Sequence, residues 1–245
     1  MPIIDVHAHL GSWAFPTRSI GVEPTNKLLE KFDIEKCALA AAEAVVSNFI
    51  EGNRKLAAVI EGQPRMLGYV VVNPNYIEES IEEMRKYLGR SQFVGLYFHS
   101  EYCGHLINTL ASKEILTAAR RYGKPVLVHT WGGDSVQALV EVAQEYRSLK
   151  FLMAHMGGHD WHLGIDAAKE NLNIYVVPTS AHNERDKLRS AVVGMGERGD
   201  RRILFGSGHP LTSPANVLGM VRDADLTPRQ REQILYLNAK ELFGL

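Results

Sequence analysis

The amino-acid sequence predicts a (β/α)8 barrel, in which eight parallel strands form a closed ring and helices cover its outside. Eight short apolar runs, most of them rich in β-branched or aromatic residues, begin near positions 3, 36, 66, 93, 125, 150, 174 and 203. Their starts are 24 to 33 residues apart, which leaves room for one strand, one helix and two short loops in each unit. Near-continuous apolar strands that alternate with helices are typical of a parallel sheet covered by helices.

The individual elements follow from the local pattern. In chain order, the predicted strands are IIDVH, KCALAAA, MLGYVVV, FVGLYF, PVLVH, KFLMAH, IYVV and ILFG. Apolar residues three or four apart predict helices over 77–88, 113–122 and 135–146. Thr227 and Pro228 are a typical cap and first residue for a last helix that ends at Gly244. The alternative, an open doubly wound sheet, predicts a GxGxxG turn after an early strand, and the sequence has none there.

Length and composition limit the class of protein. A chain of 245 residues, 45% of them hydrophobic, can bury one large core but is short for two ordinary domains, so we expect a single domain over residues 1–245. The net charge of -1 provides no basic surface for nucleic acid or for an anionic membrane. No apolar run approaches the roughly 20 residues of a membrane-spanning helix. We therefore expect a small molecule as the partner.

Two further expectations concern the cell and the assembly. The only cysteines, Cys37 and Cys103, have no CxxC spacing, which fits a reducing cytoplasm better than an oxidising compartment. Several apolar positions on the predicted helices look exposed, so we expect a homodimer.

Histidines gather where the predicted strands end. His7 and His9 lie two residues apart in DVHAH, so the period of a strand turns both imidazoles to the same side. His129 ends the fifth strand. The carboxyl ends of barrel strands form the active face, so His7, His9 and His129 can hold one divalent metal and leave a position open for water. Nitrogen ligands favour zinc, with manganese, nickel and iron as alternatives.

His155, at the end of the sixth strand, is the predicted catalytic residue. A histidine accepts and returns protons near neutral pH, and a role as a second-metal ligand is the alternative. Three loop residues are candidate substrate contacts: Trp131, His159 and Arg18. Arg18 could pair a substrate carboxylate through its guanidinium, although a solvated surface position is the ordinary alternative for Arg18 and for His159.

Other polar residues also follow predicted strands. His99, His105 and His182 lie where they could shape the pocket. Glu101, Asp134 and Asp160 are acids within reach of the barrel mouth.

Four segments together resemble a known family. IIDVHAHLG, PVLVHTWGG, FLMAHMGG and RILFGSGHP occur in the order and spacing of the amidohydrolase superfamily, specifically its amidohydrolase-2 branch of metal-dependent TIM-barrel hydrolases and decarboxylases. LGYVVVNPN and ILYLNAKELFGL are similar to that branch as well, so the resemblance covers nearly the whole chain. It implies a divalent metal, usually zinc, bound by His7, His9 and His129. It also implies that His155 polarises the substrate or moves protons.

The end of the eighth predicted strand departs from that family pattern. The family's metal-binding aspartate, which also accepts the proton of the attacking water, falls where this sequence has Gly208. Three-histidine zinc still lowers the pKa of bound water to about 7, so we expect metal binding and turnover to be weakened and not necessarily abolished. We expect solvent, or a rotated His209, in the vacant position. If the glycine is a loss, Gly208→Asp should strengthen both properties.

Three functions follow from these observations. The first is hydrolysis of a small ester, lactone, amide or carboxylate by metal-activated water, with His155 assisting. The second is non-oxidative, metal-dependent decarboxylation. The third is ligand binding without turnover by a degenerate relative, for which Gly208 is the observation. No residue in the sequence names the substrate.

Overall fold

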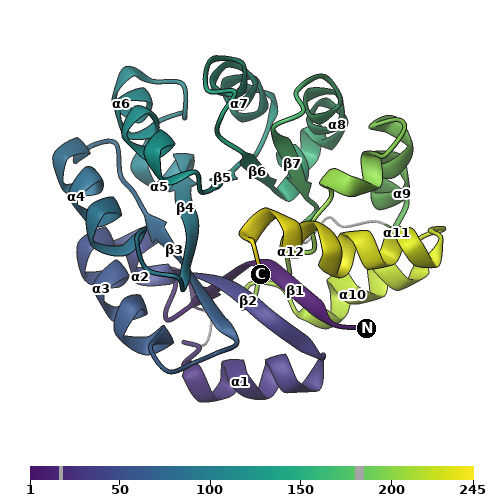
Figure 1. The fold of residues 1–245 in the computed structure, drawn as a ribbon, viewed down its shortest axis with the longest axis horizontal. Helices are drawn as coiled ribbons and strands as arrows, with labels where there is room; N and C mark the ends of the chain where they lie inside the picture. Colours follow the sequence, from purple (N-terminus) through teal and green to yellow (C-terminus); the bar gives the residue numbers. More distant parts are fainter. Residues whose placement is uncertain (17–18, 180–184) are drawn as a thin grey trace.

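The structure is a computed structural model that describes residues 1–16, 19–179 and 185–245. Its parallel strands follow one another in chain order around a curled sheet, and helices cover the outside (Figure 1). This confirms the barrel class that the sequence predicts. The strands are β1 Ile3–Leu10, β2 Ile34–Ala41, β3 Met66–Val71, β4 Phe93–His99, β5 Val126–His129, β6 Phe151–Ala154 and β7 Ile174–Val177.

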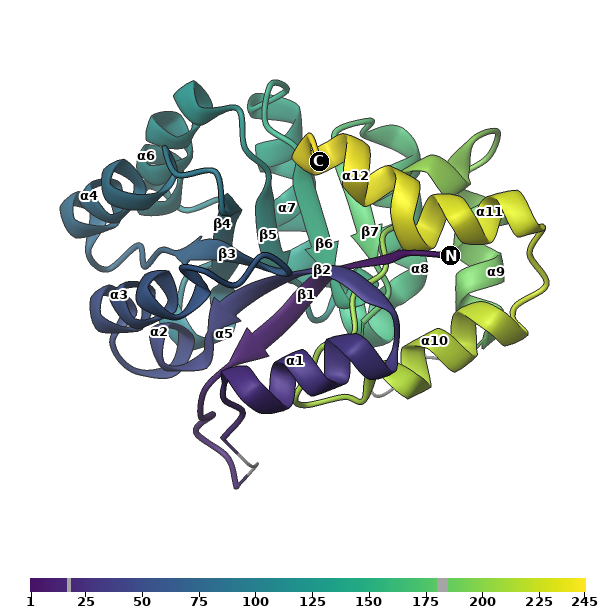
Figure 2. The same cartoon turned by 60° about the horizontal axis from the view of Figure 1, so that its bottom comes forward.

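The helices lie mainly between successive strands, as a barrel requires. Figure 2 shows the same arrangement from a second side, with the segment after β1 extending beyond the carboxyl end of that strand. The α-helices are α1 Val22–Lys31, α2 Ala42–Val46, α3 Phe49–Ile60, α4 Ile77–Tyr87, α5 Ser100–Cys103, α6 Leu110–Ala119, α7 Gly133–Glu145, α8 Trp161–Glu170, α9 Arg185–Gly194, α10 Pro214–Asp223, α11 Pro228–Glu232 and α12 Asn238–Phe243. Across the described part of the chain, none of the helices has both the length and the apolar character that a membrane crossing requires.

The strands are buried on both faces, which explains their near-continuous apolar sequences. Every residue of β1, β3, β4, β5 and β6 is buried. One face of each strand fills the interior of the curled sheet, and the other packs against the helices. Charged and polar residues within β1 are therefore exceptions that require a specific reason.

The predicted eighth strand, ILFG, is irregular in the structure, so the barrel is slightly distorted where it closes. Ile203 makes an isolated parallel bridge with Val176 of β7. The segment still runs beside β7, because the backbone N–H of Leu204 donates to the carbonyl oxygen of Val176 at 2.9 Å. Seven strands thus form the regular sheet, and residues 203–209 complete the ring without a continuous ladder.

Hydrogen bonds to β1 close the other side of this segment. The backbone N–H of Val6 donates to the carbonyl oxygen of Phe205 at 2.9 Å. The Oδ1 atom of Asp5 accepts from the backbone N–H of Ser207 at 2.9 Å, across 202 positions of the sequence. Gly208 has a φ of +68°, which strands do not contain, so the extended conformation ends there.

The helices predicted from apolar spacing are present with shifted ends. The helix over 77–88 is α4, and the helix over 135–146 is α7. The helix predicted from residue 113 begins earlier, at Leu110, because the side chain of Thr109 caps it by accepting from the backbone N–H of Ser112. Residues 120–122 continue it as a 3₁₀ turn.

The last helix begins at the predicted cap. The Thr227 side chain and the Gln230 side chain each accept from the other's backbone N–H, so both initial donors are satisfied. The helix then passes through a π-helical turn at residues 233–237 and ends at Gly244, which has a φ of +68°.

Candidate metal-binding and catalytic site

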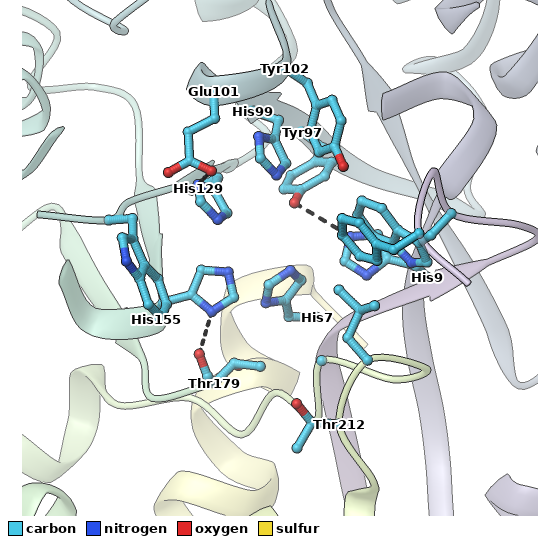
Figure 3. A pocket seen from close by; sticks show the side chains of 15 residues that line it. His7, His9, Tyr97, His99, Glu101, Tyr102, His129, His155, Thr179 and Thr212 are labelled. Atoms are coloured by element: carbon cyan, nitrogen blue, oxygen red, sulfur yellow. Dashed lines mark hydrogen bonds and ion pairs between the residues drawn. The ribbon is translucent and has the colours of Figure 1, made fainter. Parts of the chain in front are cut away.

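A pocket of about 380 Å³ lies at the carboxyl ends of the strands (Figure 3). This is the face on which the sequence places the histidines. The pocket is lined by His7, His9, Trp13, Phe15, Tyr97, His99, Glu101, Tyr102, His129, Trp131, His155, Thr179, Gly208, Leu211 and Thr212.

His7 and His9 come from β1 and both face the pocket, as their spacing predicts. Their ring centroids are 5.1 Å apart. Nε2 of His9 lies 3.4 Å from the hydroxyl oxygen of Tyr97, which comes from β4. Nδ1 of His9 and both ring nitrogens of His7 are buried and have no hydrogen-bond partner. The β1 pair therefore holds three buried nitrogen atoms without a hydrogen-bond partner at the pocket wall.

His99 and His129 form a second pair on neighbouring strands. They are register partners at the ends of β4 and β5, and their rings stack with centroids 3.9 Å apart at an interplanar angle of 11°. Nδ1 of each ring is buried and has no hydrogen-bond partner. Glu101 follows on α5, with its Oε2 atom 4.0 Å from Nδ1 of His129.

His155 lies between the two pairs, directly after β6. Its ring centroid is 5.2 Å from that of His7 and 4.7 Å from that of His129. Nδ1 contacts the carbonyl oxygen of Thr179, and because a carbonyl only accepts, Nδ1 carries the proton. The lone pair of the neutral ring is then on Nε2. The backbone of His155 has a φ of +64°, a strained conformation for a residue other than glycine, which is often found at functional sites.

Burial keeps the five histidines neutral. It is the largest cause of the lowered pKa values of His9 and His99, which fall to about 3, and of His155, which falls to about 4. The pKa values of His7 and His129 are also lowered well below the ordinary value. Neighbouring imidazoles add to the shift in all of these except His155, because a second positive charge nearby is unfavourable. Neutral imidazole is the form that binds a metal.

The unpartnered nitrogen atoms fit a bound cation. A buried polar atom without a hydrogen bond costs about 1–3 kcal/mol, and this pocket contains several on His7, His9, His99 and His129. A divalent metal that accepts their lone pairs would offset that cost. The donor set therefore fits the metal that the family resemblance implies.

Gly208 lines the pocket, but its present backbone conformation leaves no room for a Cβ atom. A Cβ atom built on Gly208 would lie 2.5 Å from Cγ2 of Thr179, and the φ of +68° is unfavourable for any larger residue. The backbone N–H of Gly208 donates to the carbonyl oxygen of His7 at 2.8 Å. Glycine is thus required by the local backbone as it stands.

His209 contributes to the site through its backbone. Its carbonyl oxygen accepts from the backbone N–H of His9 at 2.7 Å, which fixes β1 beside the closing segment. Its side chain is half-buried, is absent from the described pocket lining and leaves Nε2 without a partner. The rotated His209 side chain that the sequence suggests is therefore not observed.

The remaining residues predicted from the sequence differ in whether they line the pocket. Trp131 lines the pocket. His159 is exposed and does not line it; its Nε2 lies 3.4 Å from Oδ2 of Asp160. Arg18 and His182 lie outside the residues that the structure describes.

Several pocket residues were not singled out by the sequence analysis. Tyr97 precedes His99 by two positions, the same spacing as in the β1 pair, and this repeat could have indicated Tyr97. Thr179 comes from a loop, where no periodic signal marks it.

A parallel barrel with a histidine-lined pocket at the carboxyl ends of its strands is an arrangement typical of metal-dependent barrel enzymes. The chain belongs to the amidohydrolase family, whose model, described as Amidohydrolase, matches residues 4–245. This confirms the resemblance carried by the sequence motifs. None of the curated proteins that were compared matches the chain.

Solved structures with the same fold include decarboxylases and a hydrolase. The 5-carboxyvanillate decarboxylase from Sphingomonas paucimobilis is 12% identical, with a TM-score of 0.80 and coverage of 100% of this chain and 99% of that chain. A dihydroxybenzoic acid decarboxylase from a Polaromonas species, with bound manganese and the inhibitor 2-nitroresorcinol, is 17% identical, with a TM-score of 0.76 and coverage of 100% and 97%. A probable 2-pyrone-4,6-dicarboxylic acid hydrolase from Acinetobacter baumannii, with citric acid bound, is 16% identical, with a TM-score of 0.73 and coverage of 100% of both chains.

Proposed function

We propose that the protein decarboxylates a small aromatic or conjugated carboxylic acid in a reaction that depends on a divalent metal at the histidine cluster. His7, His9 and His129 are the ligands that we propose from the sequence. Zinc suits these nitrogen donors, and the manganese bound by one structural neighbour makes manganese the main alternative.

The observation that carries this proposal is the composition of the pocket wall. Aromatic rings surround the cavity on several sides, contributed by Trp13, Phe15, Tyr97, Tyr102 and Trp131. Within residues 1–16, 19–179 and 185–245, no Lys or Arg side chain lines it. A flat conjugated substrate would pack well against these rings.

The scarcity of cationic side chains also bears on the reaction. A substrate carboxylate in this pocket would lose much of its hydration without gaining an ion pair from these described residues. Desolvation destabilises a carboxylate more than the transition state in which its charge spreads into the conjugated system. Loss of carbon dioxide relieves this unfavourable state, provided that the proposed metal polarises a different substrate oxygen.

The residues of the chain supply the proton chemistry. The neutral Nε2 of His155 accepts a proton from a substrate or water oxygen and returns it to the ring carbon. That carbon keeps the electron pair of the broken bond to the carboxylate, which leaves as carbon dioxide. When bound, the metal supplies Lewis-acid polarisation of a substrate oxygen.

Hydrolysis of an ester, lactone or amide is the second candidate. The fixed tautomer of His155 supports it too, because a neutral Nε2 can act as a base toward water as well as toward a substrate oxygen. In that reaction His155 would return the proton to the leaving group. The remaining possibility, ligand binding without turnover, was suggested by Gly208 alone.

Product analysis separates the three candidates. Protein loaded with Mn²⁺ or Zn²⁺ would be incubated with hydroxybenzoic acids and, separately, with aryl esters and lactones. Release of carbon dioxide and the decarboxylated product is expected from the acids, and the His155→Asn variant should lose it. His162→Ala is the matched control, because His162 is exposed and does not line the pocket. Hydrolysis products without carbon dioxide would replace the proposal by the second candidate, and no product from metal-loaded protein would favour the third.

A further inference from the structure

We propose that Glu101 selects the substrate by its second polar substituent: it favours an acid that carries a hydroxyl group and disfavours one that carries a second carboxylate. Glu101 lies in α5, directly after β4, and lines the pocket. Figure 3 shows its carboxylate beside the His129 ring, at the edge of the cavity. The inference rests on the proposed function, because it concerns which conjugated acid the same pocket takes.

The charge of the pocket wall resides on Glu101. Among the described residues, the lining contains no Lys, Arg or Asp, and burial keeps its histidines neutral. Oε2 of Glu101 lies 4.0 Å from Nδ1 of His129, which is one of these neutral rings, and no cation within the described ranges pairs with the carboxylate. Burial raises the pKa of Tyr97 and of Tyr102, and the charge of Glu101 adds to both shifts. The negative charge therefore acts on the pocket without compensation from these residues.

The backbone fixes where this charge lies. The Ser100 hydroxyl donates to the carbonyl oxygen of His129 at 3.3 Å, which ties the start of α5 to the end of β5. His155, the proposed base, also neighbours His129, with ring centroids 4.7 Å apart. The His129 ring thus lies between the proposed base and the Glu101 carboxylate (Figure 3). A single aromatic substrate that places its reacting carbon at His155 can therefore also reach Glu101.

The chemistry of a carboxylate decides what it accepts at that end of the substrate. An ionised carboxylate accepts hydrogen bonds but donates none. A substrate hydroxyl beside Glu101 would donate to it, and a hydrogen bond to a charged group is stronger than one between neutral groups. A second substrate carboxylate would instead face a like charge. Because 59% of the Glu101 side chain is exposed, water screens part of this repulsion, and the result is a preference and not complete exclusion.

Matched pairs of acids test the inference. Salicylates that carry either a hydroxyl or a carboxylate at the same ring position would be compared in Zn²⁺-loaded protein. Decarboxylation gives kcat/KM, and quenching of tryptophan fluorescence gives Kd without turnover, since Trp13 and Trp131 line the pocket. At the ring position that faces Glu101, the hydroxyl acid should be preferred about tenfold or more over its carboxylate counterpart.

Glu101→Gln should move the two acids in opposite directions. The hydroxyl acid should lose affinity and the dicarboxylic acid should gain it, because the amide is neutral and donates as well as accepts hydrogen bonds. Loss of the metal or of the fold would weaken both acids alike, so the ratio between them isolates the role of Glu101. The matched control is Asp134→Asn, which changes an exposed carboxylate at the start of α7 that does not line the pocket and should leave the ratio unchanged.

The inference is overturned if the unmodified protein takes both acids of every pair equally, if Glu101→Gln changes both by the same factor, or if none of the acids binds. Selective binding that Glu101→Gln reverses, in a protein that releases no carbon dioxide, would overturn only the proposed function.

Discussion

The ring of His155 is fixed by the carbonyl oxygen of Thr179, which accepts the proton on Nδ1 and leaves Nε2 free toward the pocket. The contact joins the end of β6 to the segment after β7. It therefore sets both the position and the tautomer of the proposed base, and it does so through backbone that a side-chain substitution at Thr179 leaves in place.

Replacement of His155 by asparagine should lower turnover on the order of 100-fold or more, because the variant retains a polar group but no proton acceptor of comparable basicity. Steady-state kinetics on the substrate identified by product analysis would measure this. Mn²⁺ affinity should change little, since His155 is not among the proposed ligands. A variant with nearly normal kcat would show that the base lies elsewhere.

Substitution of Gly208 should destabilise the fold. Gly208→Ala places a Cβ against Thr179 and forces a positive φ on an alanine, so we expect a loss of about 1–3 kcal/mol in the free energy of unfolding. Gly208→Asp should lose at least as much. This loss of stability would outweigh any gain in metal affinity from the new carboxylate. Urea denaturation would measure both.

Two controls isolate the cause of that destabilisation. Gly219→Ala changes a glycine in α10 whose added Cβ meets no atom within 4 Å and should not destabilise the protein. Thr179→Ser removes the clashing methyl group but keeps the hydroxyl that donates to the carbonyl oxygen of Gly206. Combined with Gly208→Ala, it should recover part of the lost stability; strict additivity of the two changes would argue against the clash.

Metal removal should abolish turnover and lower the stability of the folded protein. Treatment with a chelator leaves the buried imidazole nitrogens unpartnered, so the midpoint of thermal unfolding should fall and should rise again when Mn²⁺ or Zn²⁺ is added. Elemental analysis of the purified protein would identify the metal. Identical unfolding curves with and without metal would contradict binding in the folded state.

The metal-free protein should lose stability as the pH falls from about 6.5 toward 4. The unfolded histidines take up protons near 6.5, whereas His9, His99 and His155 resist protonation until about 3 to 4 in the folded state. The unfolded state therefore binds more protons in this window, which favours unfolding. Asp5 acts in the opposite direction, because burial raises its pKa from 3.8 to about 6.

Urea denaturation of chelated protein at several pH values would measure this dependence. His7 and His129 shift in the same direction as the other pocket histidines, so the histidines outweigh the single opposing carboxyl. Asp5→Asn should steepen the loss on acidification by removing the opposing group. Stability that is constant or that rises between pH 6.5 and 4 would contradict the neutral state of the buried cluster.

Much of the barrel is predictable because its signals are local. The apolar runs of β1 to β7 and the cap at Thr227 are each encoded within a few residues. The spacing of His7 and His9 likewise places both rings on one face without knowledge of the rest of the chain. The convergence of His129 and His155 with them follows from the parallel order of the strands alone.

The closing segment was less predictable because its conformation depends on distant partners. The apolar sequence ILFG favours a regular strand, but the positive φ of Gly208 and its contact with Thr179 arise only when residues 203–209 meet β1 and the end of β7. The sequence places Glu101 within reach of the barrel mouth, and the structure confirms that it lines the pocket. The stacking of His99 on His129 beside it arises only when β4 pairs with β5, so no local pattern predicts it.

The hydrogen bond between Asp5 and Ser207 has a consequence for how the protein matures in the cell. It joins β1 to a segment that is synthesised 202 positions later, so β1 lacks its second neighbour while the rest of the barrel is made. Until then the free edges of β1 and β7 resemble unpaired sheet edges, which associate readily with other chains. A chain that terminates before this segment should therefore aggregate. In the full chain, β1, which carries His7 and His9, is the strand that chaperones would have to protect for the longest time.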